Sequence, residues 1–398
     1  MNKRLLPLAL GGLGIGTTEF VMMGLLPDIA SDFNISIPTA GYMISAYALG
    51  VVIGAPLLVA ASSRMAPKNI LIGLMLMFTV FNVLSAFAPS HTTLFLARLF
   101  AGLPHGAFFG VGSVVASRLA DKGKEAQAIS KMFAGLTIAN LLTVPLGTYI
   151  GHHYSWRYTF GSIGLIGLLT LAALYFLLPA LPKTNNGSIK SELKVFARLE
   201  PWLIFLITAI GTGGLFCWIS YIAPLMIKVS NFDPATVPYI MMVAGLGMVV
   251  GNFVGGKLAD HLKPLNACVV LLIAMAVTLV LIYFVSSNQN LSLIMTFIAG
   301  SCALAIAAPI QILMIQMTKG AEMLGASVTQ AGFNIGNALG AFLGGLPLAA
   351  GFGYSSPVLV GVIMAIFGAG FAWVLVIREK APQEEPLTEF EVSGHKFL

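Results

Sequence analysis

Long apolar runs separated by short polar breaks extend through the whole chain. The breaks contain charged residues or clusters of Pro, Gly and Asn. The apolar runs lie at 5–26, 40–60, 69–89, 93–118, 129–150 and 160–180, and then at 202–222, 238–259, 265–286, 291–317, 324–346 and 355–377. Because a helix needs about 20 apolar residues to cross a bilayer, each run predicts one membrane span. The pattern predicts an all-α membrane protein with twelve transmembrane helices arranged as two six-helix bundles.

A polar stretch at residues 181–201 divides the runs into two sets of six. We therefore predict an N-terminal six-helix bundle at 1–180, a cytosolic linker at 181–201 and a C-terminal six-helix bundle at 202–377. The remaining residues, 378–398, are acidic and show no hydrophobic period. Such a segment cannot bury enough apolar surface to fold, so we predict a disordered cytosolic tail.

The composition supports the membrane class. Hydrophobic residues make up 58% of the chain and charged residues only 9%, whereas a soluble domain carries about 25% charged residues. This scarcity excludes an ordinary soluble enzyme and a nucleic-acid-binding protein. The three cysteines lie inside apolar runs, so they predict neither disulfides nor a metal site. A phosphate-binding loop of the G-x-x-x-x-G-K-[ST] type is not present in the sequence, so direct drive by ATP is not expected.

The basic residues predict the orientation. When the chain starts in the cytosol and crosses at each run, all 21 Lys and Arg residues fall on the cytosolic side except Arg157, Lys228 and Arg98. Arg157 and Lys228 fall outside, and Arg98 falls inside a span. Cytosolic loops of membrane proteins carry the excess of Lys and Arg. We therefore expect both termini in the cytosol and a multi-pass protein of the bacterial inner membrane.

Several short motifs resemble one family of transporters. They are 256–260 (GKLAD) between the eighth and ninth runs, 98–102 (RLFAG) in the fourth, 145–147 (PLG) with Gly151 in the fifth, and 17–20 (TTEF) with 24–30 (GLLPDIA) in the first. Together they resemble the major facilitator superfamily. Within it they are similar to the bacterial drug:proton antiporter branch, and to arabinose-efflux and chloramphenicol-resistance-like permeases in particular.

The resemblance implies a secondary active transporter that works by alternating access. In this branch the activity is proton-coupled efflux of small organic molecules, either drugs or sugars. A proton-coupled uptake symporter of a small neutral solute is the alternative, and a membrane-embedded enzyme or receptor is less favoured. The expected partners are a small-molecule substrate, protons and the lipid bilayer, with no nucleic acid. We expect a monomer with no cofactor, energised by the proton gradient.

The resemblance also implies a gate in the cytosolic loops. Asp260 ends the second-half motif, and Arg64 belongs to its first-half copy. That copy keeps Gly54, Pro56 and Lys68 but has no acidic residue, which departs from the family pattern.

Charged and titratable side chains inside the spans are the candidates for proton coupling. Glu19 is the only acidic residue well inside a run, and Arg98 is the only basic one. A carboxyl group in the membrane faces a cavity or a partner, and burial disfavours its charged form. We predict that Glu19 carries the proton, that Arg98 tunes it, and that His105 relays protons. The alternatives are a static ion pair, an Arg bound to backbone carbonyls, and a neutral, hydrogen-bonded His.

Uncharged polar and aromatic residues inside the spans are the candidates for substrate binding. Ser327, Gln330, Asn334 and Asn337 share one helix face by spacing, and Gln311 is a similar single residue in another run. The predicted substrate-binding residues are Phe20, Phe108, Asn140, Trp218, Tyr221, Gln330, Phe333 and Asn334. The alternative is that these side chains only bind or pack between helices. No spaced set of Cys, His and carboxylates suggests a metal site.

Overall fold

The computed structural model describes residues 3–35, 37–62, 64–182, 193–233 and 236–380. These residues form helices and no β-strand, so the all-α class is confirmed for them. The centre of the predicted linker and nearly all of the predicted tail lie outside the described residues.

The first half contains seven helical elements and one π-helical turn. They are α1 (Leu6–Asp32), α2 (Ile37–Ser62), α3 (Pro67–Ala86), α4 (His91–Arg118), α5 (Glu125–Ile138), η1 (Ala139–Thr143), α6 (Val144–His153) and α7 (Trp156–Leu177). The first helix extends six residues beyond the predicted end of its apolar run at residue 26. Glu19 consequently lies near the middle of α1.

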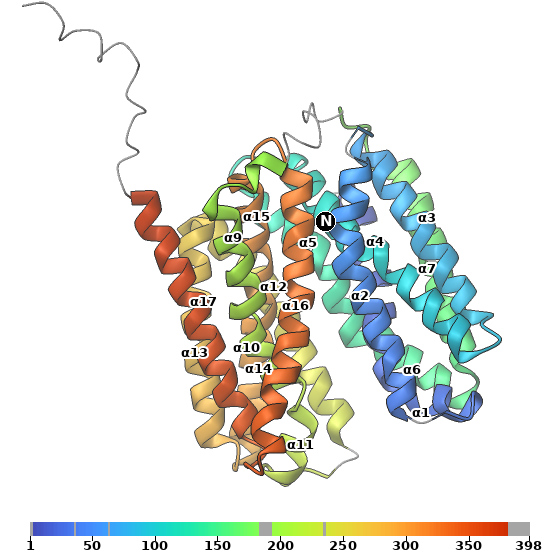
Figure 1. Ribbon diagram of the computed structural model, residues 1–398, viewed down its shortest axis with the longest axis vertical. Helices are drawn as coiled ribbons and strands as arrows, with labels where there is room; N and C mark the ends of the chain where they lie inside the picture. Colours follow the sequence, from blue (N-terminus) through green and yellow to red (C-terminus); the bar gives the residue numbers. More distant parts are fainter. Residues whose placement is uncertain (1–2, 36, 63, 183–192, 234–235, 381–398) are drawn as a thin grey trace, which may run out of the picture.

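The second half follows the same plan. Its elements are α9 (Leu199–Leu206), η2 (Ile207–Gly211), α10 (Gly213–Ile219), α11 (Ile222–Lys228), α12 (Val237–Leu262), α13 (Pro264–Val285), α14 (Gln289–Ala305), α15 (Ala307–Met317), α16 (Glu322–Ala349) and α17 (Ser356–Lys380). Figure 1 shows the helices of the second half on one side of the molecule and those of the first half on the other. α5 of the first half and α16 of the second lie where the two sides meet.

Two prolines interrupt long helices at the positions that their chemistry dictates. Proline has no N–H to donate to the carbonyl four residues earlier. Pro145 therefore leaves the carbonyl of Leu141 without its helical partner, and Leu141 lies in the π-helical turn η1. Pro309 does the same to Ala305, the last residue of α14; α15 begins at Ala307.

Eleven helical stretches among the described residues are long and apolar enough to cross a membrane. The remaining predicted span corresponds to α16, which has 28 residues. Gln330, Asn334 and Asn337 lower its hydropathy, which explains why it is not among the eleven. The polytopic membrane class is thus confirmed, whereas the twelfth span stays a prediction.

The two halves are an internal repeat with an offset of 197 residues, which becomes 198 along α4 and α14, where Gly102 meets Tyr47 as Gly300 meets Ala244. Asn34 and Asn231 both have a positive φ, 53° and 56°, and Gly123 and Gly320 have φ values of 79° and 86°. In both halves the helix after the glycine begins with a Glu whose Oε1 accepts the glycine N–H at 3.1 Å. Since the same turn begins α5 and α16, these helices are counterparts.

Helix pairings repeat in the same way. α2 packs along α4 as α12 packs along α14, and α3 packs along α7 as α13 packs along α17. This correspondence lets each residue of the first half be compared with the one that occupies its place in the second.

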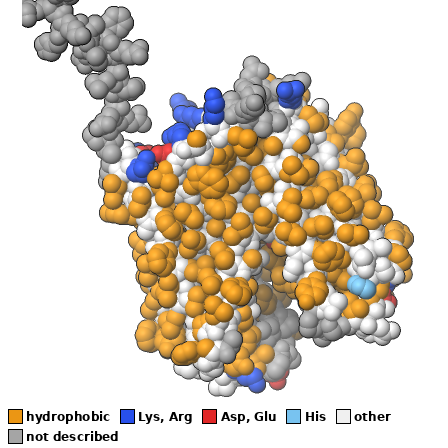
Figure 2. All heavy atoms as spheres, in the orientation of Figure 1, with side chains coloured by type: hydrophobic (Ala, Val, Ile, Leu, Met, Phe, Trp, Pro, Cys, Tyr) orange, Lys and Arg blue, Asp and Glu red, His pale blue; other side chains and the backbone are white. Residues whose placement is uncertain are grey.

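The halves meet through α5 against α12 and through α16 against α2 and α4. The closest approaches are Gly256 against Ser130 and Gly110 against Ser327, where an added Cβ would overlap the serine. Both serines lie near the starts of their helices, at the end of the molecule where the N-terminus and the end of α17 lie (Figure 1). Figure 2 shows Lys and Arg side chains at this end and a hydrophobic surface below it.

The close helix contacts predict which glycines the fold requires. A Cβ at Gly251 of α12 would overlap the carbonyl oxygen of Ser301 in α14, whereas nothing lies near Gly73 of α3. We expect Gly251→Ala to cost about 1–3 kcal/mol through overpacking and to lower the unfolding temperature. The control Gly73→Ala should leave stability unchanged or raise it by up to about 1 kcal/mol. Thermal unfolding followed by intrinsic fluorescence tests this, and equal stability of the two variants would contradict it.

Candidate functional site

The Arg98 side chain is fully buried among the helices of the first half. Its Nη1 donates to the Thr18 hydroxyl at 2.6 Å, and its Nη2 donates to the Thr18 carbonyl at 2.8 Å. The rings of Tyr47 and Phe160 lie 4.4 and 5.4 Å from the guanidinium carbon. Its Nε is buried with no described partner. Helices α1, α2, α4 and α7 thus converge on a single guanidinium group.

Glu19 lies next to this group without binding it. The side chain is partly buried, and its carboxyl group interacts electrostatically with Arg98 and with Tyr47. Among the described residues it forms no ion pair, since Arg98 binds Thr18 instead. Successive residues of an α-helix point about 100° apart, so a guanidinium held by Thr18 is not automatically held by Glu19. The sequence predicts that Glu19 and Arg98 work together. The structure brings them near each other, but they form no ion pair.

His105 joins the same group through Tyr47. Its Nδ1 lies 3.1 Å from the Tyr47 hydroxyl, and its ring contacts those of Tyr47 and Phe109. Because Tyr47 also lies over Arg98, one tyrosine connects His105 to the guanidinium. Whether His105 relays protons stays a prediction.

The internal repeat shows that these groups belong to the first half alone. The counterparts of Glu19, Arg98 and His105 are Phe216, Thr296 and Ala303. None of the three counterparts bears a charge at neutral pH. The buried acidic, basic and histidine side chains of this group therefore belong to the first half alone.

A linked group of amide side chains lies in the second half. Gln330 donates to the Oε1 of Gln311 at 3.0 Å, Gln311 donates to the Ala326 carbonyl at 3.0 Å, and Asn334 donates to the Gln330 carbonyl at 3.1 Å. The counterpart of Gln330 in the first half is Phe133. The structure thus brings Gln311 to two of the residues that the polar spacing selected.

The predicted aromatic wall divides into two groups. Phe108 and Trp218 are fully buried in the cores of the two halves, and Phe108 packs where α1 has Gly11. Phe20 and Phe333 are partly buried. Tyr221 donates to the Ala341 carbonyl at 2.7 Å, and Asn140 donates to the Leu136 carbonyl of its own helix at 3.1 Å. The structure gives Phe108 and Trp218 packing roles and leaves the others closer to open space.

The second-half loop motif joins the two halves. Asp260 at the end of α12 accepts the backbone N–H groups of Ala126 and Gln127, at 3.0 and 3.1 Å, in the first turn of α5. A carboxylate is favourable at the N-terminus of a helix, where free N–H groups and the helix dipole meet it. Nearby, Ser130 and Asn252 exchange two hydrogen bonds of 2.8 and 2.7 Å with each other's backbone carbonyls. Arg64 is exposed in the turn before α3.

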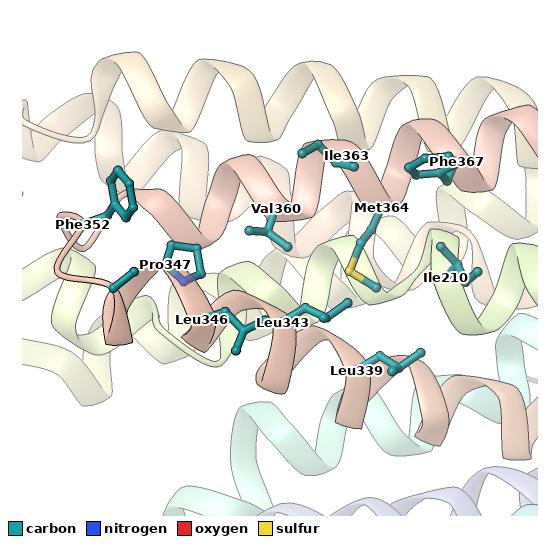
Figure 3. A pocket seen from close by; sticks show the side chains of 11 residues that line it. Ile210, Leu339, Leu343, Leu346, Pro347, Phe352, Val360, Ile363, Met364 and Phe367 are labelled. Carbon is teal, nitrogen blue, oxygen red and sulfur yellow. The ribbon is translucent and has the colours of Figure 1, made fainter.

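A separate cavity lies on the outer surface of the second half. It measures about 610 Å³ and is lined only by apolar side chains of η2, α16 and α17, among them Leu343, Met364 and Phe367 (Figure 3). None of the polar residues described above lines it. Among the described residues, no group of three or more His, Cys, Asp or Glu side chains could hold a metal ion.

Sequence reasoning missed Thr18, Asn82 and Tyr47. Asn82 is a fully buried amide inside the apolar run of α3, which is the signal that could have selected it. Thr18 lies in the motif next to Glu19, but a helical threonine usually bonds its own backbone. Tyr47 carried no signal in the sequence.

An apolar helical repeat with a charged group buried inside one half defines a polytopic membrane transporter. The chain belongs to the Major Facilitator Superfamily, since residues 8–329 match that family. It is similar to the putative transporter AraJ of Escherichia coli, with 40% identity over 96% of this chain and 97% of the relative. The inner membrane transport protein YdhP of the same organism is also 40% identical, over 97% of this chain and 98% of YdhP. The MFS-type transporter YtbD of Bacillus subtilis is 36% identical over 86% and 87%.

Solved structures show the same fold. The proton:xylose symporter XylE superposes with a TM-score of 0.75 at 17% identity, covering 94% of this chain and 95% of XylE. FucP in its outward conformation gives a TM-score of 0.75 at 15% identity, covering 93% and 98%. These comparisons confirm the predicted superfamily. They also confirm a multi-pass protein of the bacterial inner membrane, and a transporter as opposed to an enzyme.

The contact at Asp260 predicts how tightly the two halves are held. We expect Asp260→Ala to speed hydrogen exchange at the first-turn amides of α5 about tenfold, because a hydrogen bond to a charged group contributes roughly 1.5–3 kcal/mol and this one is partly exposed. Hydrogen exchange with mass spectrometry measures the rate. The control is Asp121→Ala, which removes an exposed carboxylate near the same helix that pairs only with Lys124. Unchanged exchange in Asp260→Ala would show that this contact does not hold the halves together.

Proposed function

We propose that this protein is a proton-driven secondary transporter that exports a small organic molecule by alternating access. The observation that carries the proposal is the unpaired carboxyl of Glu19 beside the buried guanidinium of Arg98 in the middle of the first half. A carboxyl group in a low-dielectric site exists in two protonation states of similar energy only when a neighbouring charge offsets burial. Arg98 supplies that charge.

In the proposed cycle, Glu19 takes a proton from the outside and releases it to the cytosol after the carrier has turned inward. Release accompanies substrate loading. The halves rock at the contacts of α5 with α12 and of α16 with α2 and α4, and Asp260 and Arg64 form the cytosolic gate. If the basic end is cytosolic, the closed contacts at that end make this an outward-facing conformation.

The substrate is proposed to lie between the halves. Gln330 and Asn334 would bind it from the second half, with Phe20, Asn140, Tyr221 and Phe333 around it. In the described part of the chain these amides bond other amides and backbone carbonyls and no Lys or Arg, which disfavours substrates with two negative charges. Neutral, cationic or zwitterionic amphipathic molecules, or sugars, fit this chemistry.

Efflux is favoured over uptake by the resemblance of 145–147 (PLG) and of 17–20 (TTEF) to antiporter motifs. The alternative is a proton-coupled uptake symporter that uses the same Glu19. Loaded vesicles distinguish the two, because an exporter driven by an inward proton gradient moves substrate outward against its concentration gradient. We further propose twelve spans with α16 as one of them, both termini in the cytosol, and a monomer that needs no cofactor.

The role of Glu19 can be tested with a ligand found by a thermal-shift screen of sugars, antibiotics and nucleosides. In proteoliposomes we expect Glu19→Gln to abolish transport driven by a pH gradient, because the amide cannot release a proton. Counterflow exchange of the labelled ligand, which needs no net proton movement, should persist. The matched control is Glu379→Gln, which changes an exposed carboxyl in the last turn of α17. Proton-driven transport that survives intact in Glu19→Gln would overturn the proposal.

The role of the amide stripe can be tested with the same ligand. Asn334 donates to its own helix through Nδ2, which leaves its Oδ1 available to a substrate donor. We expect Asn334→Ala to raise KM up to about tenfold, in line with the loss of one hydrogen bond of roughly 1 kcal/mol, and to leave proton coupling intact. The control Thr329→Val removes a buried hydroxyl that bonds the Gly325 carbonyl of the same helix. A KM that does not distinguish the two variants would exclude Asn334 from the binding site.

A further inference from the structure

We infer that Thr18 and Asn82 are positioning residues that hold the Arg98 guanidinium on the backbone of α1 and away from the Glu19 carboxylate, and that this hold sets the proton affinity of Glu19. The inference rests on the proposed proton-carrying role of Glu19. Neither residue touches a substrate or carries the proton itself.

Thr18 binds Arg98 through two different oxygens. The hydroxyl accepts from Nη1 at 2.6 Å and the carbonyl accepts from Nη2 at 2.8 Å, so two terminal nitrogens of the guanidinium are held by one residue. Planar, two-point contacts of this kind fix an arginine in direction as well as in distance. Both oxygens are neutral, however, so the positive charge of Arg98 has no bound counter-ion within the ion-pair distance.

Asn82 makes the Thr18 hydroxyl an acceptor. A hydroxyl has a single hydrogen, and Thr18 gives it to the Oδ1 of Asn82 at 2.5 Å. Other threonines of these helices, such as Thr17 and Thr79, give theirs to the carbonyl four residues earlier. The Nδ2 of Asn82 donates to the Phe78 carbonyl at 2.8 Å, which fixes the orientation of the amide. With its hydrogen directed to Asn82, the Thr18 oxygen presents its lone pairs to Arg98.

The consequence for Glu19 is a competition. When Glu19 loses its proton, the carboxylate attracts the guanidinium, but Arg98 can move to it only by giving up the two bonds to Thr18. The hold therefore reduces the stabilisation that Arg98 offers to ionised Glu19. Without the Thr18 hydroxyl, Arg98 would pair with Glu19 more readily, and the carboxyl would release its proton at a lower pH.

The charged surroundings of Glu19 leave few other groups that could produce the same effect. Arg98 of α4 and Tyr47 of α2 interact with it electrostatically, and His105 of α4 joins through the Tyr47 hydroxyl. The remaining charged or titratable residues of α1 and of the helices that pack against it lie toward the ends of the spans, when α5, η1 and α6 are counted as one span. They are Asp28 and Asp32 of α1, His91 and Arg118 of α4, Glu125 and Lys131 of α5, Tyr149, His152 and His153 of α6, and Arg157, Tyr158 and Tyr175 of α7. Tyr42 of α2 lies toward the start of that helix.

The internal repeat supports a specialised role over a packing role. The counterparts of Thr18 and Asn82 are Leu215 and Leu279, and Thr296 stands at the place of Arg98. The Thr296 hydroxyl bonds the Ser292 carbonyl of its own helix, so the second half has no buried charge to hold at this place and keeps apolar side chains where Thr18 and Asn82 stand in the first. The three polar residues occur as a set in the half that contains Glu19.

The test measures protonation of Glu19 directly and needs no substrate. In the purified, lipid-reconstituted full chain, pH-difference infrared spectra show the carbonyl stretch of a protonated carboxyl, and its loss in Glu19→Gln assigns the Glu19 band. We expect Thr18→Val, which keeps the side-chain shape, to move the midpoint of that band at least about 1 pH unit lower, the size expected when an opposite charge becomes free to pair. Asn82→Leu should move it in the same direction.

Two controls separate positioning from general disturbance. Thr18→Ser keeps the hydroxyl and should restore the wild-type midpoint. Thr17→Val removes the neighbouring hydroxyl of the same helix, which bonds Leu13 and Thr143 and not Arg98, and should leave the midpoint unchanged. A wild-type midpoint in folded Thr18→Val, an equal shift in Thr17→Val, or a Glu19 band that does not titrate would each overturn the inference.

The outcome is distinguishable from that of the proposed function. If Glu19→Gln retains proton-driven transport while Thr18→Val still shifts the Glu19 midpoint, the positioning is correct and the coupling role is wrong. If Glu19→Gln abolishes proton-driven transport and Thr18→Val leaves the midpoint unchanged, the coupling role stands and the positioning fails.

Discussion

A positive charge buried without a bound counter-ion is the constraint on which the first half depends. Removing a guanidinium from water costs several kcal/mol unless nearby groups compensate. Thr18 supplies two oxygens to Arg98, Tyr47 and Phe160 supply ring faces, and Asn82 accepts the hydrogen of the Thr18 hydroxyl. Four helices must approach closely to do so, and the carboxyl of Glu19 is left beside the charge. The contacts that offset the cost of burying Arg98 also leave its charge beside Glu19, which makes Glu19 a candidate proton carrier.

The internal repeat explains how one fold can divide two tasks. Both halves keep the positive-φ Asn and Gly of two corresponding turns and the same helix pairings. The side chains placed on this common frame differ: ionisable groups lie in the first half, and the linked amides of Gln311 and Gln330 lie in the second. Proton chemistry and substrate recognition can therefore sit on opposite sides of one interface, and movement of that interface couples them.

The interface itself is asymmetric. Hydrogen bonds join α5 to α12 through Asp260 and through the Ser130–Asn252 pair. On α16, Ser327, the counterpart of Ser130, packs against Gly110 of α4 and its hydroxyl has no described partner. One contact is polar and directional, and the other depends on close packing. Such a pair suits a joint that pivots on one side and separates on the other.

The sequence by itself determined the membrane class, the superfamily and nearly all the spans, because hydropathy over about 20 residues is a local property. It also selected Glu19 and Arg98, since charges in apolar runs are rare. It did not determine that Arg98 binds Thr18 and not Glu19, that Asn82 directs the Thr18 hydroxyl, or that Phe108 and Trp218 are core residues. Those outcomes depend on which helices become neighbours. Only the tertiary structure brings Thr18, Asn82 and Arg98 within hydrogen-bonding distance across sixty to eighty residues of chain.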